Sequence, residues 1–202
     1  MSSHRLVDDP RLERWLAALL ATPGLTSIDD LAEARRMLLD DALRAVEIVR
    51  RFDGPIVDVG SGGGSPGIPL AAALPDREVS LLEASRRKCE FLREVAGEFP
   101  NVTVIEGRAE EQETDRFGVA LAKALAKPQV AAEWCLPLVR PDGAAILWVG
   151  PSADLAAVGR AAEQVGGATP ELEEGLVVVQ KASPTPQGFP RRAGMARKRP
   201  LA

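Results

Sequence analysis

Apolar and polar positions alternate along this chain in two different periods. From Pro55 onward, short runs of mainly aliphatic residues alternate with segments whose apolar residues recur at helical spacing. This alternation is typical of a parallel sheet with crossover helices, so we expect an α/β fold. The predicted strands are Ile56–Val59, Val79–Leu82, Val102–Glu106, Gly118–Ala122 and Ala144–Val149, and the predicted helices are Ile68–Ala73, Arg86–Glu98, Pro128–Leu138 and Asp154–Val165.

The segment before Pro55 is helical in pattern. Residues 8–21 place Leu12, Trp15 and Leu19 on one helical face. After a Thr-Pro-Gly break, a longer helical pattern begins at Ser27 and ends at residues 53–55. We expect these two helices to form an N-terminal cap, residues 1–54, beside a core of residues 55–182.

The end of the chain carries two different patterns. Residues 166–180 predict two strands joined by the acidic turn Glu171–Gly175, which would form an antiparallel edge on the sheet. From residue 183 onward, the density of proline and arginine predicts no regular structure of any length. Residues 183–202 are therefore predicted to be a basic tail that lies across the surface or is mobile.

Charge is unevenly distributed over the 202 residues. The net charge is −4, yet six basic residues and no acidic residue occur from Lys181 to the end. The remaining 19 basic and 29 acidic residues give residues 1–180 a charge of −10, against +6 for the terminal segment. This asymmetry favours an anionic partner, nucleic acid first, although a solvated tail has the same composition.

Composition argues against several classes of protein. No apolar run approaches the roughly 20 residues of a membrane span, and acidic residues stand where a signal peptide needs an apolar core. We therefore expect a cytoplasmic protein without a membrane partner, and a monomer. Cys89, Cys135 and the single His4 lack metal-ligand partners at short spacing, so we expect neither a metal site nor a Cys–His nucleophile pair.

The segment Pro55–Pro69 holds the richest candidate chemistry. An apolar strand runs into a turn with five glycines in eight residues, which allows a ligand to approach the backbone closely. Three of the glycines match the dinucleotide fingerprint, but the match starts two residues late. Pro66 and Pro69 also remove N–H donors where a pyrophosphate-binding helix would begin. The turn therefore favours S-adenosylmethionine over NAD, and a plain β–α connection is the structural alternative.

Three charged residues stand at or near predicted strand ends. Asp58 would be costly to bury without a partner, so it is predicted to meet the cofactor's amino group or to orient the glycine turn. Glu83 follows Gly60 by 23 positions and can accept hydrogen bonds from both ribose hydroxyls, or cap the next helix. Lys123 is predicted to project over the ligand cleft and contact the backbone or acceptor base of a nucleic acid.

Five segments together resemble the small-subunit ribosomal RNA methyltransferase G family, also called glucose-inhibited division protein B. They are Val57–Leu70, Leu82–Leu92, Gly107–Glu111, Ala122–Ala126 and Pro190–Leu201. The resemblance spans residues 35–202. It implies a class I, Rossmann-like methyltransferase fold, with a mostly parallel seven-stranded sheet and an antiparallel edge. It also implies methyl transfer from S-adenosylmethionine to N7 of one guanine in 16S ribosomal RNA, alone or within the 30S subunit.

The predicted site combines the residue patterns with this resemblance. Ala109 would leave room for the adenine ring, and the basic tail would anchor phosphate. Lys123 is the predicted catalytic residue. The predicted cofactor residues are Asp58, Gly60, Ser61, Gly62, Gly64, Gly67, Glu83, Ala84, Arg108, Ala109, Glu110 and Lys123, and the predicted RNA contacts are Lys123, Trp148, Arg191, Arg192, Arg197, Lys198 and Arg199.

The chain departs from the family pattern at three places on the acceptor side. A His-x-x-Asp-Ser pattern is replaced by Met37-Leu-Leu-Asp-Asp41, an arginine by Lys123, and a lysine in an Ala-Leu-Lys-Gly setting by the segment Trp148-Val-Gly150. Arginine and lysine are not equivalent where a bidentate contact is needed. Trp148 can stack an unstacked base or serve as a core residue of a central strand.

The implied reaction asks little of acid–base chemistry. Guanine N7 carries an exposed lone pair, so attack on a methyl group needs no general base, and catalysis rests on positioning and dehydration. This agrees with the absence of a candidate catalytic histidine or cysteine. Two alternatives stay open at this point: a non-catalytic or altered-acceptor RNA-binding relative, and an NAD-dependent oxidoreductase.

Overall fold

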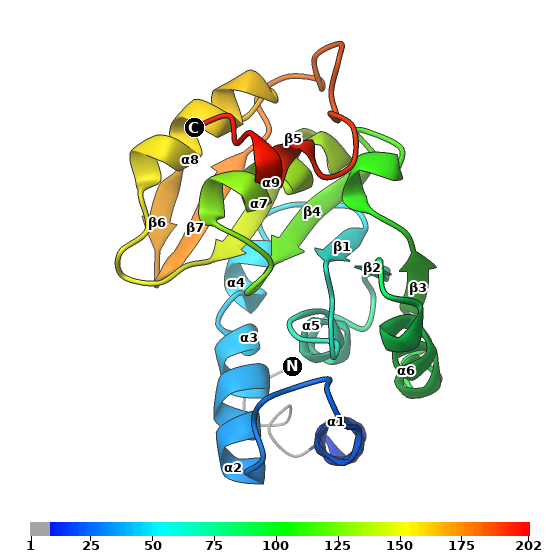
Figure 1. Ribbon diagram of the computed structural model, residues 1–202. Helices are drawn as coiled ribbons and strands as arrows, with labels where there is room; N and C mark the ends of the chain where they lie inside the picture. The colour runs from blue at the N-terminus through cyan, green and yellow to red at the C-terminus, as the bar shows by residue number, and fades with distance from the viewer. Residues whose placement is uncertain (1–8) are drawn as a thin grey trace.

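The computed structural model describes residues 9–202, which are built around one seven-stranded sheet (Figure 1). The strand order is β3-β2-β1-β4-β5-β7-β6, and β7 runs in the opposite direction to the other six strands. The predicted parallel sheet with an antiparallel edge is thereby confirmed. The strands are β1 (Ile56–Val59), β2 (Val79–Glu83), β3 (Val102–Glu106), β4 (Phe117–Ala122), β5 (Val139–Trp148), β6 (Glu171–Glu173) and β7 (Leu176–Gln180).

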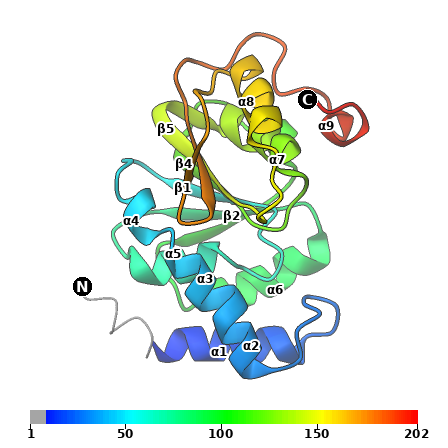
Figure 2. The same cartoon turned by 90° about the vertical axis from the view of Figure 1, so that its left-hand side faces the viewer.

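Helices cover both faces of the sheet, as Figures 1 and 2 show. The 3-10 turns η3 (Ala109–Glu111) and η4 (Leu136–Leu138) follow β3 and α7. One layer holds α5 (Gly67–Ala73), α6 (Arg86–Ala96) and the N-terminal helices, and the other holds α7 (Pro128–Cys135) and α8 (Leu155–Gln164).

The sheet separates two hydrophobic cores. Consecutive residues of a strand point to opposite faces, so Ile56 packs in one core and Val57 in the other, and neither is exposed. A sheet covered on both faces needs apolar side chains at nearly every central position, and all four residues of β1 are buried. Asp58 is the polar exception in that strand.

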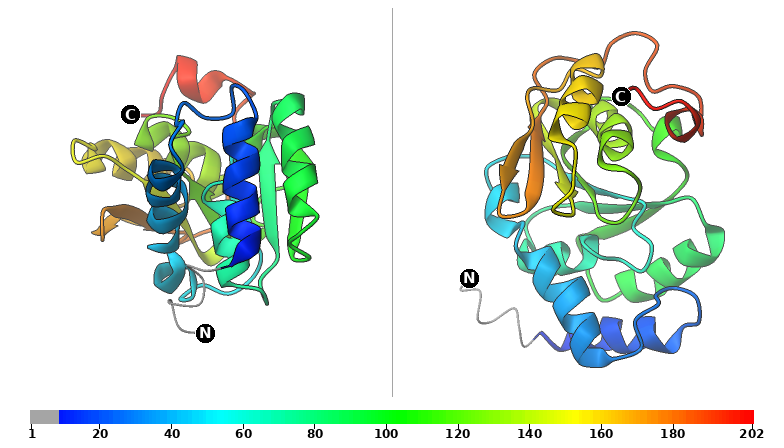
Figure 3. Two further views of the ribbon diagram at one scale, coloured as in Figure 1. Left: turned by 90° about the horizontal axis from the view of Figure 1, so that it is seen from below. Right: turned by 60° about the vertical axis from the view of Figure 1, so that its left-hand side comes forward.

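The N-terminal segment packs on the α5–α6 side and shares its core. Helix α1 (Pro10–Ala21) is capped by Asp9, whose carboxylate accepts a hydrogen bond from the backbone N–H of Arg11. It lies alongside α6, as Figure 3 (left) shows, and Arg14 pairs with Glu98 just beyond that helix. Because α1 buries Trp15 in the core of the sheet, the cap is part of the main body of the molecule. His4 and Asp8 lie outside the described residues.

The second N-terminal helix was predicted as one long element and is instead broken. It consists of α2 (Leu31–Ala34), the π-helical turn η2 (Arg35–Asp40), α3 (Asp41–Leu43) and α4 (Val46–Val49). In the π-helical turn, backbone carbonyls of Met37 and Leu38 accept hydrogen bonds from side chains of the sheet and the glycine turn. Widened turns of this type are rare and are frequently found at functional sites.

The predicted antiparallel edge is present, but its first strand and its turn lie at different residues from those predicted. The predicted turn Glu171–Gly175 contains strand β6, and the observed turn is Glu174-Gly175, both with positive φ (49° and 76°). Pro170 cannot donate to a ladder, so β6 starts only after it. Residues 166–168 form no strand, and Gly167 makes a single bridge to Lys181.

The predicted structureless tail is also corrected. It contains a one-turn helix, α9 (Met195–Lys198), which follows Gly194 in the left-handed region (φ 81°). Within residues 9–202, no helix has the length and apolar character to cross a membrane.

Candidate functional site

The buried side chain of Asp58 in β1 is hydrogen-bonded to the glycine turn that follows this strand. This side chain is 1% exposed, and its Oδ2 accepts from the N–H of Gly67 at 3.0 Å. Burial raises the pKa of Asp58 to about 7, although the hydrogen bond from the N–H of Gly67 by itself lowers this pKa. A Cβ on Gly67 would collide with Leu81 and Asp58, so only glycine fits here. Asp58 therefore orients the turn, one of its two predicted roles.

The turn is covered by helix α1. The indole N–H of Trp15 donates to the carbonyl of Gly63 at 2.8 Å. A Cβ on Gly63 would meet the side chain of Leu19. The absence of side chains in the turn thus serves close packing of the cap as well as access for a ligand. Gly64 packs in the same way against Ile68 and Trp15, and a Cβ on Gly60 would collide with Leu125. Of the cleft-lining glycines in the turn, Gly62 has open space where a side chain would be.

Glu83 stands at the end of β2 beside this turn. One carboxylate oxygen accepts from the N–H of Gly62 at 3.0 Å, and the other accepts from the N–H of Ser85 at 2.8 Å. A carboxylate offers about four lone-pair sites, so both oxygens can still accept from a diol. Glu83 therefore supports the turn, holds the backbone of Ser85 just before α6 and faces the cleft at the same time, but it does not cap that helix.

The cleft has two adjoining parts. The first is a pocket of about 310 Å³ at the ends of β1, β2 and β3, within the usual range for a small-molecule site. Its walls combine an acidic pair, small side chains and a tryptophan. They include Val59, Gly60, Leu82, Glu83, Ala84, Lys88, Gly107, Arg108, Ala109, Glu110, Ala124, Leu125, Trp134, Gly194 and Arg197. Six predicted cofactor residues thus come together: Gly60, Glu83, Ala84, Arg108, Ala109 and Glu110.

The second part is a pocket of about 270 Å³ between the glycine turn and the cap. It shares Gly60, Lys88 and Ala124 with the first, so the two pockets adjoin. Its other walls come from the turn, from the end of β4 and from the cap: Leu19, Leu25, Thr26, Leu38, Ser61, Gly62, Gly63, Ser65 and Lys123.

Lys123 joins the end of β4 to the cap. Its ammonium lies 2.7 Å from the Oδ2 of Asp41 and also donates to the carbonyl of Met37. The lysine side chain is 13% exposed and that of Asp41 25%, so solvent screens this pair less than a surface pair. Lys123 lines the second pocket and at the same time ties the π-helical turn over it.

Trp148, predicted as a stacking face or a core residue, lies against the cap. Its indole N–H donates to the backbone carbonyl of Asp41 at 3.2 Å, and it lines neither part of the cleft. Two departures from the family pattern, Lys123 and Trp148, thus both contact a third, Asp41. The three changes form one local cluster.

The basic residues near the end of the chain fall into two groups. Lys181 is buried, donates to the carbonyl of Leu136 at 2.8 Å and lies 3.4 Å from Asp115. Arg191 forms a two-pronged ion pair with Glu133 at 2.6 and 2.7 Å. The remaining four tail cations are exposed: Arg192, Arg197, Lys198 and Arg199. The charge available to an anionic partner is thus smaller than the sequence count of six.

Several pocket residues were not predicted from the sequence. Leu19 and Leu38 come from the cap, and their apolar periodicity indicated only helix packing, whereas Leu25 lies in the connection after α1 and carried no signal. Trp134 lies in α7 and belongs to no motif. Lys88 and Leu125 had a signal, because they belong to the family segments Leu82–Leu92 and Ala122–Ala126.

The described residues suit S-adenosylmethionine. Glu83 presents acceptors for ribose hydroxyls, and Ala109 leaves a shallow wall for a purine. The side chain of Trp134 contributes an aromatic wall to the same pocket. By contrast, residues 9–202 contain no cluster of three His, Cys, Asp or Glu that could hold a metal ion.

Comparison with known proteins identifies relatives over most of the chain. Residues 11–164 match the family model described as GidB: rRNA small subunit methyltransferase G. Proteins named ribosomal RNA small subunit methyltransferase G are 35% identical in Synechococcus elongatus and 34% identical in Moorella thermoacetica, each covering 88% of this chain and 82% of the relative. The namesake in Rubrobacter xylanophilus is 36% identical, over 89% and 74% of the two chains.

Solved structures with the same fold are more distant in sequence. A SAM-dependent O-methyltransferase from Thermotoga maritima superposes with a TM-score of 0.61 at 14% identity, covering 82% of this chain and 74% of the other. A precorrin-6y C5,15-methyltransferase from Geobacter metallireducens gives 0.53 at 14% identity, covering 80% and 92%. The predicted class I methyltransferase fold is thereby confirmed.

Proposed function

This chain belongs to the rRNA small subunit methyltransferase G family, and we propose that it methylates N7 of one guanine in 16S ribosomal RNA. It is an S-adenosylmethionine-dependent enzyme that acts on small-subunit ribosomal RNA. The observation that supports this best is the match to the family together with a two-part cleft at the carboxyl ends of the parallel strands. The NAD-dependent alternative is set aside, because the family and the fold are those of methyltransferases.

We assign the first pocket to the adenosine half of the cofactor. Glu83 would accept from the ribose hydroxyls, and Ala109 and Glu110 would border the adenine. The N–H of Gly62 already bonds to Glu83, so the ribose acceptor and the turn are positioned together. Asp58, Gly64 and Gly67 are assigned to support of the turn, since none of them lines either pocket.

The second pocket would take the methionine half and face the acceptor base. S-adenosylmethionine supplies an electrophilic methyl group on a sulfonium. Guanine N7 offers a lone pair without losing a proton, so the chain needs to hold the base in line and exclude water. Leu19, Leu25 and Leu38 give this pocket an apolar wall, and Lys123 places a cation at its edge. Lys123 is thus proposed as the residue nearest the acceptor.

The exposed cations of the tail would contact phosphate. Arg192, Lys198 and Arg199 have no ion-pair partner among the described residues. Such contacts add affinity that falls with salt and carries little sequence preference, so the choice of guanine rests with the pocket. Because the acceptor is ribosomal RNA, we propose that the protein works in the cytoplasm, as a monomer.

Methyl transfer to 30S subunits from a strain that lacks this modification tests the proposal. With radiolabelled S-adenosylmethionine, the wild-type chain should label the 16S RNA. Reduction with borohydride followed by aniline should then cleave the RNA at one site, as expected for N7-methylguanine. Incorporation without such cleavage would refute N7 as the acceptor, and the absence of incorporation together with the absence of S-adenosylmethionine binding would refute the enzyme assignment.

A matched pair of variants tests the cofactor assignment. Glu83→Gln removes the charged acceptor and should weaken binding of S-adenosylhomocysteine by about 10- to 100-fold in calorimetry. Glu113→Gln makes the same change at an exposed position on the loop before β4, and should leave affinity unchanged. Equal affinities for the two variants would contradict the role of Glu83.

A further inference from the structure

The end of the chain is pinned to helix α7. Glu133 on α7 is 4% exposed, and its carboxylate accepts both prongs of the Arg191 guanidinium. The same guanidinium donates to the backbone carbonyl of Arg199 at 2.8 Å. Arg191 thereby closes residues 191–199 into a loop and holds both of its ends against the body of the molecule.

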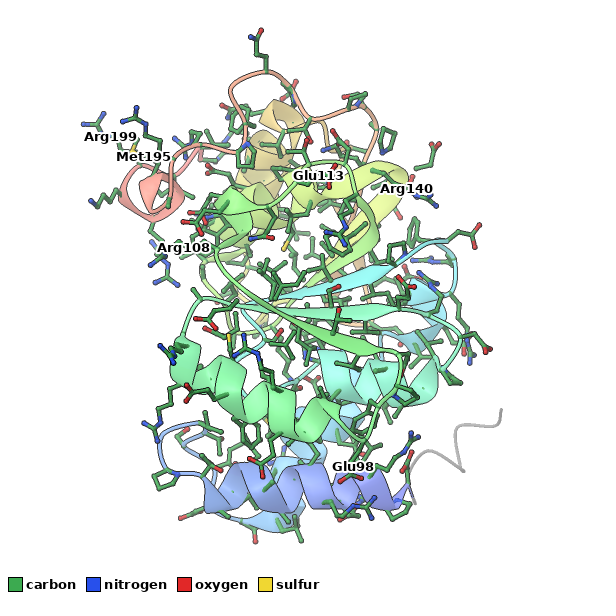
Figure 4. All side chains as sticks on the ribbon, turned by 90° about the vertical axis from the view of Figure 1, so that its right-hand side faces the viewer. Glu98, Arg108, Glu113, Arg140, Met195 and Arg199 are labelled. Carbon is green, nitrogen blue, oxygen red and sulfur yellow. The ribbon has the colours of Figure 1, made fainter. Side chains whose placement is uncertain are left out.

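This closed loop lies over the first pocket. The N–H of Gly194 donates to Glu110 Oε1 at 3.0 Å, and Arg197 donates to the carbonyl of Leu125 at 3.1 Å. Gly194 and Arg197 both line the pocket, and Ala196 between them is 2% exposed. Figure 4 shows Met195 and Arg199 of this loop on the same side of the molecule as Arg108, far from Glu98.

Trp134 forms the wall beneath Arg197. The guanidinium carbon of Arg197 lies 5.2 Å from the centre of the indole ring, a cation–π arrangement. Trp134 is 9% exposed, and its N–H is buried without an acceptor. Because this nitrogen is closed to solvent, Trp134 borders the pocket with its ring and not with its N–H.

These contacts surround the pocket wall formed by Ala109 and Glu110. A planar purine offers ring nitrogens as acceptors and two faces for stacking on a guanidinium or an aromatic ring. Glu83, on the other side of the same pocket, is assigned to the ribose. The segment 194–197 is therefore on the side where a base attached to that ribose would lie.

We propose that residues 194–197, with Trp134, form the outer wall of the adenine subsite, and that Arg197 positions the cofactor as well as carrying charge for RNA. The proposal rests on the function proposed above. It gives the tail two tasks: Arg197 and Gly194 act on the cofactor, while Arg192 and Lys198 remain free for phosphate. Cofactor binding and the order of the tail are then coupled, because the same loop serves both ligands.

Calorimetry without RNA separates these tasks. Adenosine and S-adenosylhomocysteine are the probes, since both carry the adenine and only the second carries the amino-acid part. Arg197→Ala and Trp134→Phe should each weaken both probes by about five- to tenfold. Arg192→Ala removes the same charge from an exposed neighbouring position and should keep both affinities within about twofold.

The outcomes distinguish this proposal from the proposed function. If Arg197→Ala binds both probes like the wild type, the proposal is wrong and the methyltransferase assignment stands. If the wild-type chain binds neither S-adenosylmethionine nor S-adenosylhomocysteine, both fail. Arg197→Lys provides a further check, because it keeps the charge but loses the planar group. Compared with Arg197→Ala, it should bind RNA more tightly but bind adenosine just as weakly. Full recovery of adenosine binding by lysine would overturn a stacking role.

Discussion

Asp58 makes stability depend on pH in a way that one substitution can isolate. Its carboxyl is buried under the glycine turn, and burial raises its pKa from 3.8 to about 7. In the unfolded chain the group ionises near its ordinary pKa, whereas in the fold it keeps its proton until about pH 7. The folded state therefore binds the proton more tightly, and the free energy of unfolding falls as pH rises between these two values.

The size of the effect follows from that difference. A pKa difference of about three corresponds to about 4 kcal/mol at 1.36 kcal/mol per pKa unit. Between pH 5 and pH 8, the wild-type protein should lose about 3 kcal/mol of this contribution, with most of the loss complete by pH 7. Asp58→Asn stays neutral throughout and can still accept from the N–H of Gly67 through its amide oxygen.

Urea denaturation at several pH values between 5 and 8, followed by tryptophan fluorescence, measures the difference. The gap in unfolding free energy between Asp58→Asn and the wild type should move in favour of the variant by about 3 kcal/mol as pH rises. Asp76→Asn, at an exposed position after α5, is the matched control and should show a constant gap. A gap for Asp58→Asn that is equally constant would refute the buried, neutral carboxyl.

Two ion pairs carry the remaining predictions. Lys123→Met breaks the pair with Asp41, so methyl transfer to 30S subunits should fall at least about tenfold. The Kd for S-adenosylhomocysteine should change little. A parallel loss of cofactor affinity would contradict a role at the acceptor. Arg191→Ala leaves the buried Glu133 carboxylate without its partner, so it should lower the free energy of unfolding in urea by about 3–5 kcal/mol. Arg192→Ala should leave that free energy unchanged. Equal unfolding free energies for the two variants would contradict the anchoring role of Arg191.

The strand segments of the parallel sheet and the position of the glycine turn were readable from the sequence. Their signals are local: a β-branched run such as Ile56–Val59, followed by glycines, has few other solutions. Glu83 was predicted for the same reason, because the carboxyl ends of neighbouring parallel strands meet at one edge of a sheet. Each of these predictions needs only the period of the pattern and the topology.

The break in the second N-terminal helix and the exact residues of the antiparallel sheet edge could not be predicted from the sequence. The apolar period of residues 27–49 is helical throughout, yet Lys123 and Ser65 bond the carbonyls of Met37 and Leu38 within a π-helical turn. Lys123 lies 86 residues after Met37 and Ser65 lies 27 residues after Leu38, so no local pattern can report these contacts.

The sequence alone determined the parallel sheet, the glycine turn and the place of Glu83 beside that turn, because side-chain period and strand direction decide which residues meet at the sheet edge. Only the tertiary structure decided which cations stay free and which are used internally. Arg191 and Arg192 are neighbours with the same charge, but one meets the buried carboxylate of Glu133 and the other meets solvent. Contacts between distant segments make that distinction, and they also bring the end of the chain to the first pocket.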